Sequence, residues 1–322
     1  MSPERALVTG GAGCIGSALV ERLLARGHQV SVLDNLSSGT EAHLAACAGH
    51  PRFAFVHGDL LDLELVDALV ADVETVYHLA ANPDVKLSPD DPTDRDLQQN
   101  VLGTYHVLES MRRHGVRRLA FASTSAVYGL NNGQPIPEDH PLRPISLYGA
   151  SKAGAEALIG AFHHLFGLDA WIFRFANIVG PRVRRYGRTV VGDFIDKLQK
   201  DPGRLTILGD GRQAKSYLLV DECLDAMLCA MDRAPAGMQI FNLGCEDALP
   251  VRRIADLVVE ALGLSQVQYA LTGGDGGWPG DVPRFRLDVT RIGQLGWRAR
   301  FSSEEAVRQS IAALVAGAAC RS

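Results

Sequence analysis

The sequence predicts an α/β fold in which a parallel β-sheet is covered by helices on both of its faces. Over the first half of the chain, short apolar and β-branched runs alternate with longer stretches of helical periodicity. Strands that alternate with helices in this way are typical of doubly wound parallel sheets. A glycine-rich stretch, "TGGAGCIG" (9–16), stands between the first strand-like run and the first helix-like run, the position at which such folds bind phosphate groups.

The expected elements follow one another in regular order up to about residue 177. The first strand, "ALVTG" (6–10), precedes a helix in which Ile15, Leu19 and Leu23 recur at helical spacing and which ends at Gly27. Further strands are expected at 29–34, 52–59, 75–81, 117–123 and 169–177, and helices near 60–71, 97–114 and 148–166. Glycine- and proline-rich segments then interrupt the pattern, and helical periods return near 221–233, 251–262 and 303–317.

Composition limits the classes of function. The chain has 322 residues, of which 47% are hydrophobic and 21% charged, and this length suits one large domain or two closely associated ones. The formal charge of −5 and the pI near 6.1 give no sign of a nucleic-acid or membrane partner. We found no internal repeat and no low-complexity linker, so both parts of the chain are expected to share one body.

Cysteine usage and the chain ends point to a cytoplasmic protein. The six cysteines form no CxxC pair and no metal-ligand spacing with histidine, so we expect reduced thiols and no metal site. The chain starts directly with a strand-like run, which leaves no room for a signal peptide. Its most apolar stretch, "SIAALVAGAAC" (310–320), is shorter than the ~20 residues that a membrane-spanning helix needs.

The glycine-rich stretch has the spacing of a dinucleotide-binding loop. At Gly10, Gly13 and Gly16, glycine lets the backbone turn tightly and approach a pyrophosphate at a helix N-terminus. Asp34 ends the second strand, and a carboxylate there accepts hydrogen bonds from the adenosine ribose and repels a 2′-phosphate. The pattern therefore predicts NAD rather than NADP. The alternative is a purely structural glycine turn with an aspartate that caps a loop.

Four motifs together resemble those of the extended short-chain dehydrogenase/reductases. They are the glycine spacing, "HGDL" (57–60), "HLAA" (78–81) and the stretch Tyr148-Gly-Ala-Ser-Lys152. The resemblance covers essentially the whole chain. It implies a Rossmann-type doubly wound NAD domain, expected over residues 1–176. It also implies a smaller C-terminal α/β domain for a nucleotide sugar, expected mainly over 177–322 with some segments returning to the first domain.

The resemblance also implies further NAD contacts. Asp59 and Leu60 would flank the adenine, while Leu79, Ala80 and Ala81 would pass under the pyrophosphate and the nicotinamide ribose. The residues expected at the cofactor are Gly10, Gly13, Cys14, Ile15, Gly16, Asp34, Asn35, Ser38, Gly39, Asp59, Leu60, Leu79, Ala80, Ala81, Asn100, Ser123, Tyr148 and Lys152.

Tyr148 and Lys152 are the expected catalytic pair, with Thr124 as the third member. A phenol with the ordinary pKa of ~10 is a poor base at neutral pH. An ammonium one helical turn away favours the phenolate, as does the positive charge of the nicotinamide. Thr124 aligns with the family's catalytic Ser or Thr, and its hydroxyl would bridge the sugar O4 and the Tyr148 oxygen. Ser123 and Ser125 are expected to cap the local backbone, with Ser125 lining the pocket as the alternative.

The stretch "ASTSAVYG" (122–129) contains no acidic side chain, and this absence bears on the reaction type. Similar 4,6-dehydratases carry Asp-Glu directly after the threonine, because eliminating water needs an acid and a base besides the tyrosine. Ser125 and Ala126 stand at those positions here, and neither can protonate a departing hydroxide. We therefore predict epimerisation at C4. Tyr148 takes the O4 proton while C4 passes a hydride to NAD, the 4-keto sugar rotates, and the hydride returns to the other face.

Three segments of the second half resemble the part of the family that binds a sugar nucleotide. They are "FANIVGPR" (175–182), "GDGRQAKSYLLVDE" (209–222) and "GWPGDVPRFRLD" (277–288), and their wording is most similar to UDP-glucose 4-epimerases. Asn177 would hold the diphosphate. Lys215 stands where many relatives place a phosphate-binding arginine, so it keeps the charge without the bidentate fork. The residues expected at the substrate are Val85, Lys86, Thr124, Ser125, Asn177, Arg184, Val190, Val191, Lys215, Tyr217 and Asp281.

The usual diphosphate clamp is incomplete in this sequence. Gly276 stands where relatives often have a second phosphate arginine. Arg182, Arg184 and Arg185 are the candidates to replace it, and a solvated loop is the alternative for this arginine run.

Several functional alternatives remain open. A UDP-hexose of the UDP-glucose/UDP-galactose type is the first expectation, and Arg184 would suit the C6 carboxylate of UDP-glucuronate. Phe285 falls near the family's gate at the sugar C2 substituent, where its bulk disfavours an N-acetyl group. Another nucleotide-sugar dehydratase, decarboxylase or ketoreductase is a second class, and a non-catalytic NAD-sensing protein is a third. The presence of both Tyr148 and Lys152 argues against the sensor.

A homodimer is expected through the helices near 97–114 and 148–166, which pair into a four-helix bundle in the resembling family. The second of these helices carries more apolar surface than one contact with a sheet requires. Its residues on adjoining faces are Ala153, Ala157, Leu158, Ala161 and Phe162.

Overall fold

Seven strands form the main sheet in the order β12-β7-β5-β4-β1-β2-β3, and every neighbouring pair is parallel. The computed structural model describes residues 4–86, 90–182 and 189–319. The strands of this sheet are β1 (Arg5–Thr9), β2 (Gln29–Asp34), β3 (Phe53–His57), β4 (Thr75–His78), β5 (Arg118–Thr124), β7 (Asp169–Phe175) and β12 (Met238–Leu243). The chain reverses its direction across the sheet between β1 and β4, and ligands of doubly wound folds bind beyond the carboxyl ends of strands at such a switch point.

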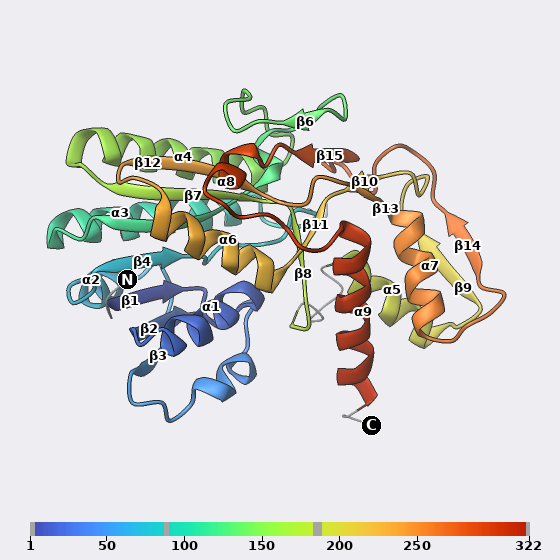
Figure 1. Cartoon of the computed structure of the whole chain (residues 1–322), viewed down its shortest axis with the longest axis horizontal. Helices are drawn as coiled ribbons and strands as arrows, with labels where there is room; N and C mark the ends of the chain where they lie inside the picture. Colours follow the sequence, from blue (N-terminus) through green and yellow to red (C-terminus); the bar gives the residue numbers. More distant parts are fainter. Residues whose placement is uncertain (1–3, 87–89, 183–188, 320–322) are drawn as a thin grey trace.

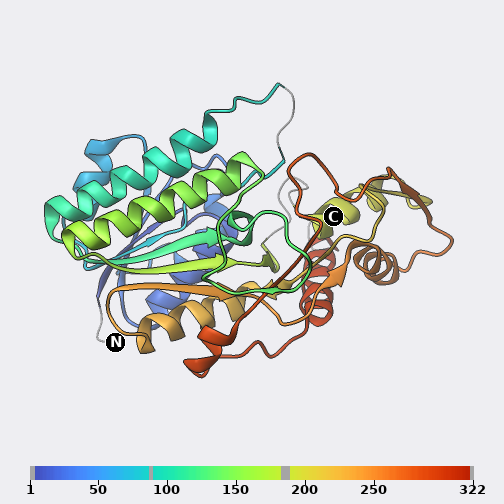
Figure 2. The same ribbon diagram turned by 90° about the horizontal axis from the view of Figure 1, so that it is seen from above.

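Two helical layers cover the sheet, as the alternating pattern predicted. Val8 and Val32 pack toward the layer of α1 and α6, whereas Leu7 and Leu33 point to the opposite face, where α2, α3 and α4 lie. Figure 2 shows the sheet between α3 and α4 on one side and α6 on the other. The bounds of these helices are α1 (Cys14–Ala25), α2 (Leu63–Val70), α3 (Gly103–His114), α4 (Leu147–Phe166) and α6 (Val220–Arg233).

A second group of elements lies beside the carboxyl ends of the main strands (Figure 1). It has its own apolar core, in which α5, α7 and α9 pack around short strands. Its helices are α5 (Val190–Lys200), α7 (Val251–Ala261) and α9 (Ser303–Ala319). The short helix α8 (Thr290–Gln294) instead packs beside β12 of the main sheet, with Ile292 in the same core as α1 and α6. Its strands are β6 (Pro135–Ile136), β8 (Asn177–Val179), β9 (Arg204–Ile207), β10 (Ala214–Lys215), β11 (Tyr217–Leu219), β13 (Leu249–Pro250), β14 (Gln268–Leu271) and β15 (Arg284–Leu287).

The two parts of the chain exchange segments. β12 comes from the second half of the sequence and extends the main sheet beside β7, while β6 comes from the first half and pairs with β15. β8 begins at Asn177, where the predicted division lies. The division into residues 1–176 and 177–322 stays a prediction about domains.

The outer helices α3 and α4 carry exposed apolar side chains, although not all of those expected from the sequence. Phe162 is buried in the core beneath α4 and Leu158 packs against that core, because both lie on the helix face that meets the sheet. The large apolar side chains exposed on this surface are Leu97, Leu102, Tyr105, Leu165 and Phe166. Over the ranges that the structure describes, none of the helices has both the length and the apolar character needed to cross a bilayer.

Candidate active site

The loop between β1 and α1 approaches the carboxyl end of β4 closely. Gly10 has a φ of +72°, and a Cβ atom there would lie 2.7 Å from the backbone of Ala80. A Cβ atom on Gly16 would collide with the carbonyl oxygen of Gly10. α1 begins at Cys14, and its N-cap Gly13 has no side chain to occupy the first N–H groups of the helix. These N–H groups can therefore meet an anion such as a pyrophosphate.

Asp34 lies at the end of β2 beside this loop. Its Oδ2 accepts a hydrogen bond from the Ala12 N–H at 2.9 Å, and its Oδ1 accepts one from the Leu36 N–H at 2.8 Å. Each carboxylate oxygen has a further lone pair, so Asp34 can still accept a hydrogen bond from a ribose hydroxyl. Its contact with the ribose remains a prediction.

A cavity of about 550 Å³ runs along the carboxyl ends of the central strands. The residues expected at the cofactor that lie on its wall are Gly10, Gly13, Cys14, Ile15, Gly16, Asp34, Asn35, Ser38, Leu60, Leu79, Ala80, Ala81, Ser123, Tyr148 and Lys152. Gly39, Asp59 and Asn100 are not among the described residues that line it. Gly39 is packed against Ala12, and the other two form hydrogen bonds within the protein.

These hydrogen bonds give Asp59 and Asn100 supporting positions. Asp59 accepts a hydrogen bond from the Asn35 side chain at 2.7 Å and another from Gln99 at 3.3 Å. Asn100 is buried and accepts the Asn82 N–H at 2.7 Å. Gln99 and Asn82 line the cavity. Neither belongs to a recognisable sequence motif, so they were not predicted from the sequence.

Helix α4 brings Tyr148 and Lys152 to the end of β5. Ser146 caps the start of this helix by accepting the Gly149 N–H at 3.1 Å. Lys152 is 2% exposed, and its Nζ donates to the carbonyl oxygen of Ala122 at 2.8 Å. Tyr148 lines the same cavity, and Thr124 faces its phenol closely enough to affect its ionisation. The structure thus brings the three expected catalytic residues together.

Burial acts on the ionisation of Tyr148 and Lys152 against the effect of charge that the sequence suggests. Burial raises the pKa of Tyr148 to about 12, against an opposing effect of Thr124. Burial also lowers the pKa of Lys152 to about 7, although Glu156 and Asp96 oppose this change. Desolvation disfavours both charged forms, and its size could not be read from the i,i+4 spacing alone.

The three hydroxyls after β5 have roles that differ from those expected. Thr124 provides the local cap, because its Oγ1 accepts the Ala126 N–H at 3.1 Å. Ser123 is buried and donates to Glu156 at 2.5 Å, so it does not cap the backbone. Ser125 lines a second cavity, which was the alternative for this residue. The hydroxyl hydrogen of Thr124 remains available to Tyr148 or to a ligand.

The second cavity has a volume of about 690 Å³ and lies between the main sheet and the second group of elements. It adjoins the first, because Pro83, Asp84 and Thr189 line both. The residues expected at the substrate that lie on its wall are Val85, Lys86, Thr124, Ser125, Asn177, Val190, Val191, Lys215, Tyr217 and Asp281. Arg184 and Arg185 fall outside the described residues.

The cations expected near a diphosphate are engaged with carboxylates in this structure. Lys215 forms an ion pair with Asp281 at 2.5 Å, and its Nζ lies 5.2 Å from the ring centre of Trp278. Arg182 lies on the wall of the first cavity and not of the second. It pairs with Glu21 at 2.6 Å and donates to Ser17 of α1 at 3.0 Å.

The wall of the second cavity also contains large side chains that were not anticipated from the sequence. They are Phe194, Gln213 and Trp278. Within the described residues, Gln213 Oε1 and Trp278 Nε1 are buried without a hydrogen-bond partner. The predicted gate Phe285 is buried and also lies on this wall.

The described part of the chain contains no cluster of three or more His, Cys, Asp or Glu side chains that could hold a metal ion. The site therefore consists of a glycine cradle, a Tyr–Lys–Thr group and two adjoining cavities. This arrangement suits proton transfer at a hydroxyl that lies where the two cavities meet.

Comparisons with known proteins extend over nearly the full length. The NAD dependent epimerase/dehydratase family matches residues 6–244. A UDP-glucose 4-epimerase of Mycolicibacterium smegmatis is 37% identical over 95% of this chain and 97% of its own. The crystal structure of a UDP-glucose 4-epimerase from Thermotoga maritima with UDP-glucose has a TM-score of 0.87 at 32% identity, covering 98% of this chain and 99% of that chain.

A dehydratase is similarly close in structure. The dTDP-glucose 4,6-dehydratase from Streptomyces venezuelae with NAD bound has a TM-score of 0.88 at 30% identity, covering 98% of each chain. The same architecture thus serves both reaction types, and the distinction must come from the residues of the site.

Proposed function

The chain belongs to the NAD dependent epimerase/dehydratase family, and from this premise we propose that it epimerises a nucleotide sugar at C4. The observation that carries the proposal is the composition of the junction between the two cavities. Tyr148, Lys152 and Thr124 meet there, and the residues after Thr124 are Ser125 and Ala126. This group can exchange a proton with a sugar hydroxyl, but the positions after Thr124 offer no acid for the loss of water.

The first cavity fits the NAD of this family. A Cβ atom at Gly10 or Gly16 would fill the cradle beside α1, and Asp34 stands on the wall where the adenosine ribose is expected. Gly10, Gly13, Gly16 and Asp34 would hold the pyrophosphate and this ribose. When bound, NAD supplies a hydride acceptor and donor for C4 and a positive charge beside the phenol.

The chain's own groups handle the proton at O4. Thr124 would hold the O4 hydroxyl against the Tyr148 oxygen, and Tyr148 would take its proton when the 4-keto sugar forms and return it afterwards. The Lys152 ammonium would stabilise the phenolate. Because burial raises the pKa of Tyr148 to about 12, this reaction needs positive charge near the phenol.

Among the described residues, the carboxylates on the wall of the second cavity are those of Asp84, Asp193 and Asp281. Asp193 pairs with Lys197 at 2.6 Å, and Asp281 pairs with Lys215. Either aspartate would have to leave its ion pair with a lysine to act as an acid. This supports the epimerase over a dehydratase.

We propose a UDP-hexose of the UDP-glucose/UDP-galactose type as the substrate. Its support is the similarity to UDP-glucose 4-epimerases and the buried Phe285 on the cavity wall. The glucuronate alternative rests on Arg184, which lies outside the described residues. The cytoplasmic location expected from the sequence stays a prediction.

We also propose a homodimer. Its support is the exposed apolar surface on α3, α4 and the turn before α3. Single exposed apolar residues are ordinary, but a group of this kind on adjacent helices indicates an interface. The residues are Leu97, Leu102, Tyr105, Leu165 and Phe166.

The proposed reaction can be tested by incubating the purified protein with a panel of nucleotide sugars and identifying the products by NMR. The panel should include UDP-glucose, UDP-galactose, UDP-glucuronate, UDP-N-acetylglucosamine and dTDP-glucose. We expect interconversion of the C4 epimers of a UDP-hexose. A 4-keto-6-deoxy product, or no conversion of any sugar, would contradict the proposal.

A further inference from the structure

Three side chains on one ridge of α4 meet the end of strand β5. Tyr148, Lys152 and Glu156 are spaced four residues apart, so they lie on successive turns of the same helix face. Lys152 donates to the carbonyl oxygen of Ala122, and Glu156 accepts a hydrogen bond from the Ser123 hydroxyl at 2.5 Å. Tyr148 and Lys152, the proposed catalytic pair, are thus the first two members of a row of three residues that ends at Glu156.

The carboxylate of Glu156 is fixed by a buried arginine. Arg174 lies on β7 directly opposite Ser123 in the parallel register. Its Nη2 donates to Glu156 Oε2 at 2.6 Å and its Nε to Oε1 at 3.0 Å, and both side chains are only 4% exposed. Bidentate pairs of this kind hold a carboxylate in a single orientation.

Lys152 is surrounded by few groups that favour its charge. Tyr148 and Glu156 face it from α4, His78 from β4, and Asp96 from the segment before the π-helical turn Leu97–Leu102. Burial lowers the pKa of His78 to about 3, so this ring is neutral and offers no counter-charge. Of the two carboxylates, Glu156 opposes the burial of Lys152 more strongly than Asp96 does.

The aromatic side of the pocket adds a weaker contact. The Lys152 Nζ lies 4.7 Å from the ring centre of Phe121, and a cation over an aromatic face is attracted by its quadrupole. This contact is insensitive to pH, whereas the carboxylate one turn away attracts the ammonium electrostatically, although its ion pair with Arg174 offsets part of its charge.

We propose that Glu156 is a positioning residue for the reaction, which acts through Lys152. Locked by Arg174 and Ser123, it favours the ammonium form of Lys152 beside Tyr148. The kinetic consequence rests on the proposed function, whereas the charge of Lys152 can be measured without any turnover. The opposing interpretation is that Glu156 only neutralises Arg174 in the core.

The two interpretations predict different effects of two substitutions on the pH at which Lys152 titrates. Glu156→Gln removes the negative charge near Lys152, while Arg174→Gln breaks the same ion pair but leaves that negative charge in place. If Glu156 acts on Lys152, the first substitution should lower the pH at which Lys152 titrates and the second should not. If the pair is only structural, both should disturb Lys152 in the same direction.

Direct titration of Lys152 is practical because the lysines of the chain are Lys86, Lys152, Lys197, Lys200 and Lys215. The holoenzyme carrying ε-¹³C-lysine should be titrated by NMR, with the Lys152 resonance assigned from its loss in Lys152→Met. A buried arginine without its partner can prevent folding. The double variant Glu156→Gln/Arg174→Gln leaves neither charge unpaired. Lys152 should be titrated in this variant if a single variant does not fold.

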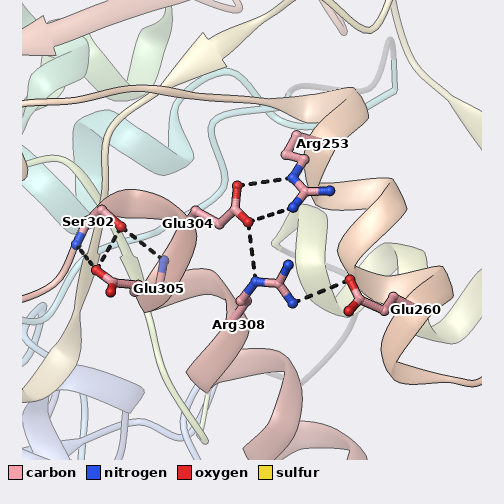
Figure 3. Close-up of polar contacts among 6 residues, drawn as sticks. All are labelled: Arg253, Glu260, Ser302, Glu304, Glu305 and Arg308. Carbon is pink, nitrogen blue, oxygen red and sulfur yellow. Dashed lines mark hydrogen bonds and ion pairs between the residues drawn. The ribbon is translucent and has the colours of Figure 1, made fainter.

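Glu304→Gln is the matched control. Glu304 is also a carboxylate held by two arginine contacts, from Arg253 at 2.6 Å and Arg308 at 3.2 Å, but it lies on α9, in a surface cluster of charged residues remote from the site (Figure 3). The same chemical change there should leave the titration of Lys152 unaltered.

We expect Lys152 to titrate about 1 to 2 pH units lower in Glu156→Gln, the range for loss of one nearby opposite charge. The double variant should lower it by less, because it also removes the positive charge of Arg174. The alkaline limb of the kcat profile should move down by the same amount, with KM little changed. An unchanged Lys152 titration in these variants, or an equal lowering in Arg174→Gln, would overturn the proposal. If Lys152 shifts as expected but no nucleotide sugar is converted by the wild type, the Glu156–Lys152 coupling stands and the proposed function fails.

Discussion

The Nζ atom of Lys215 lies 2.5 Å from Oδ1 of Asp281 at the wall of the second cavity. The two side chains are 13% and 3% exposed. Asp281 also accepts the Gly277 N–H at 2.9 Å, so the pair ties the loop that contains Trp278 to strand β10. Lys215 is consequently neutralised within the protein, and a diphosphate would have to share it with Asp281.

This pair should show the energetic asymmetry of buried ion pairs. Lys215→Met should lower the free energy of unfolding by about 3–5 kcal/mol, because it leaves a buried charge without a partner. The double variant Lys215→Met/Asp281→Leu should lose much less. Urea unfolding of the four members of the cycle measures the difference. Equal losses in the single and double variants would show that the pair is not coupled in solution.

Tyr148→Phe should remove most of the epimerase activity. The phenol is the group proposed to carry the O4 proton, and losing a general base costs about 10²–10⁴-fold in rate. Thr124→Val should cost about 10²–10³-fold in kcat, as expected for one positioned hydrogen-bonding group. Steady-state kinetics with the active UDP-sugar gives both values. A Tyr148→Phe variant with near wild-type kcat would remove Tyr148 from the mechanism.

Reaction in deuterated water should leave C4 and C5 of the sugar without solvent deuterium. In an epimerisation the hydrogen at C4 is never released to water, and C5 takes no part. A dehydratase would exchange at C5 and lose the 6-hydroxyl. NMR and mass spectrometry of the product distinguish the two. Deuterium at C5 would mean that a residue elsewhere in the site supplies the dehydration acid that Ser125 and Ala126 cannot provide.

NAD should copurify with the protein in preference to NADP. Asp34 stands on the wall of the first cavity with both oxygens already bonded to backbone N–H groups, so a 2′-phosphate would meet its negative charge. Mass spectrometry of the denatured protein identifies the bound nucleotide. Replacing Asp34 with Ser should weaken the preference, and NADP as the main nucleotide of the wild type would refute this role.

The protein should be a dimer at micromolar concentration. Leu102→Glu combined with Leu165→Glu should yield monomers, because Leu102 is exposed at the end of the π-helical turn before α3 and Leu165 is exposed on α4, where charge opposes apolar packing. Leu271→Glu is the control, since Leu271 is similarly exposed but lies on β14. Multi-angle light scattering reports the mass. A monomeric wild type would contradict the proposed interface.

Much of the fold could be predicted from local patterns. The strands before residue 177 and the helices around Leu19, Phe162 and Leu257 follow from apolar periodicity, which is set by the geometry of each element and is therefore visible in the sequence. The glycine spacing could be interpreted for the same reason. Gly10 and Gly16 meet backbone so closely that the positions exclude a side chain.

Such local patterns could not predict which side chains form pairs between different elements. Ser123 was expected to cap a turn but donates to Glu156, and Arg182 was a candidate for the substrate diphosphate but pairs with Glu21. Burial raises the pKa of Tyr148, and this burial depends on how α4 packs on β5, which no local pattern shows.

The sequence by itself determined the class of fold, the family and the group Thr124, Tyr148 and Lys152, since these depend on spacing within one element or one loop. Only the tertiary structure decided which charges neutralise one another. The row from Tyr148 to Glu156 acquires its partners from β5 and β7, and Lys215 acquires Asp281 from a loop far along the chain. Electrostatic interactions depend on distance and burial, and both are set by the register of the sheet and the packing of helices on it.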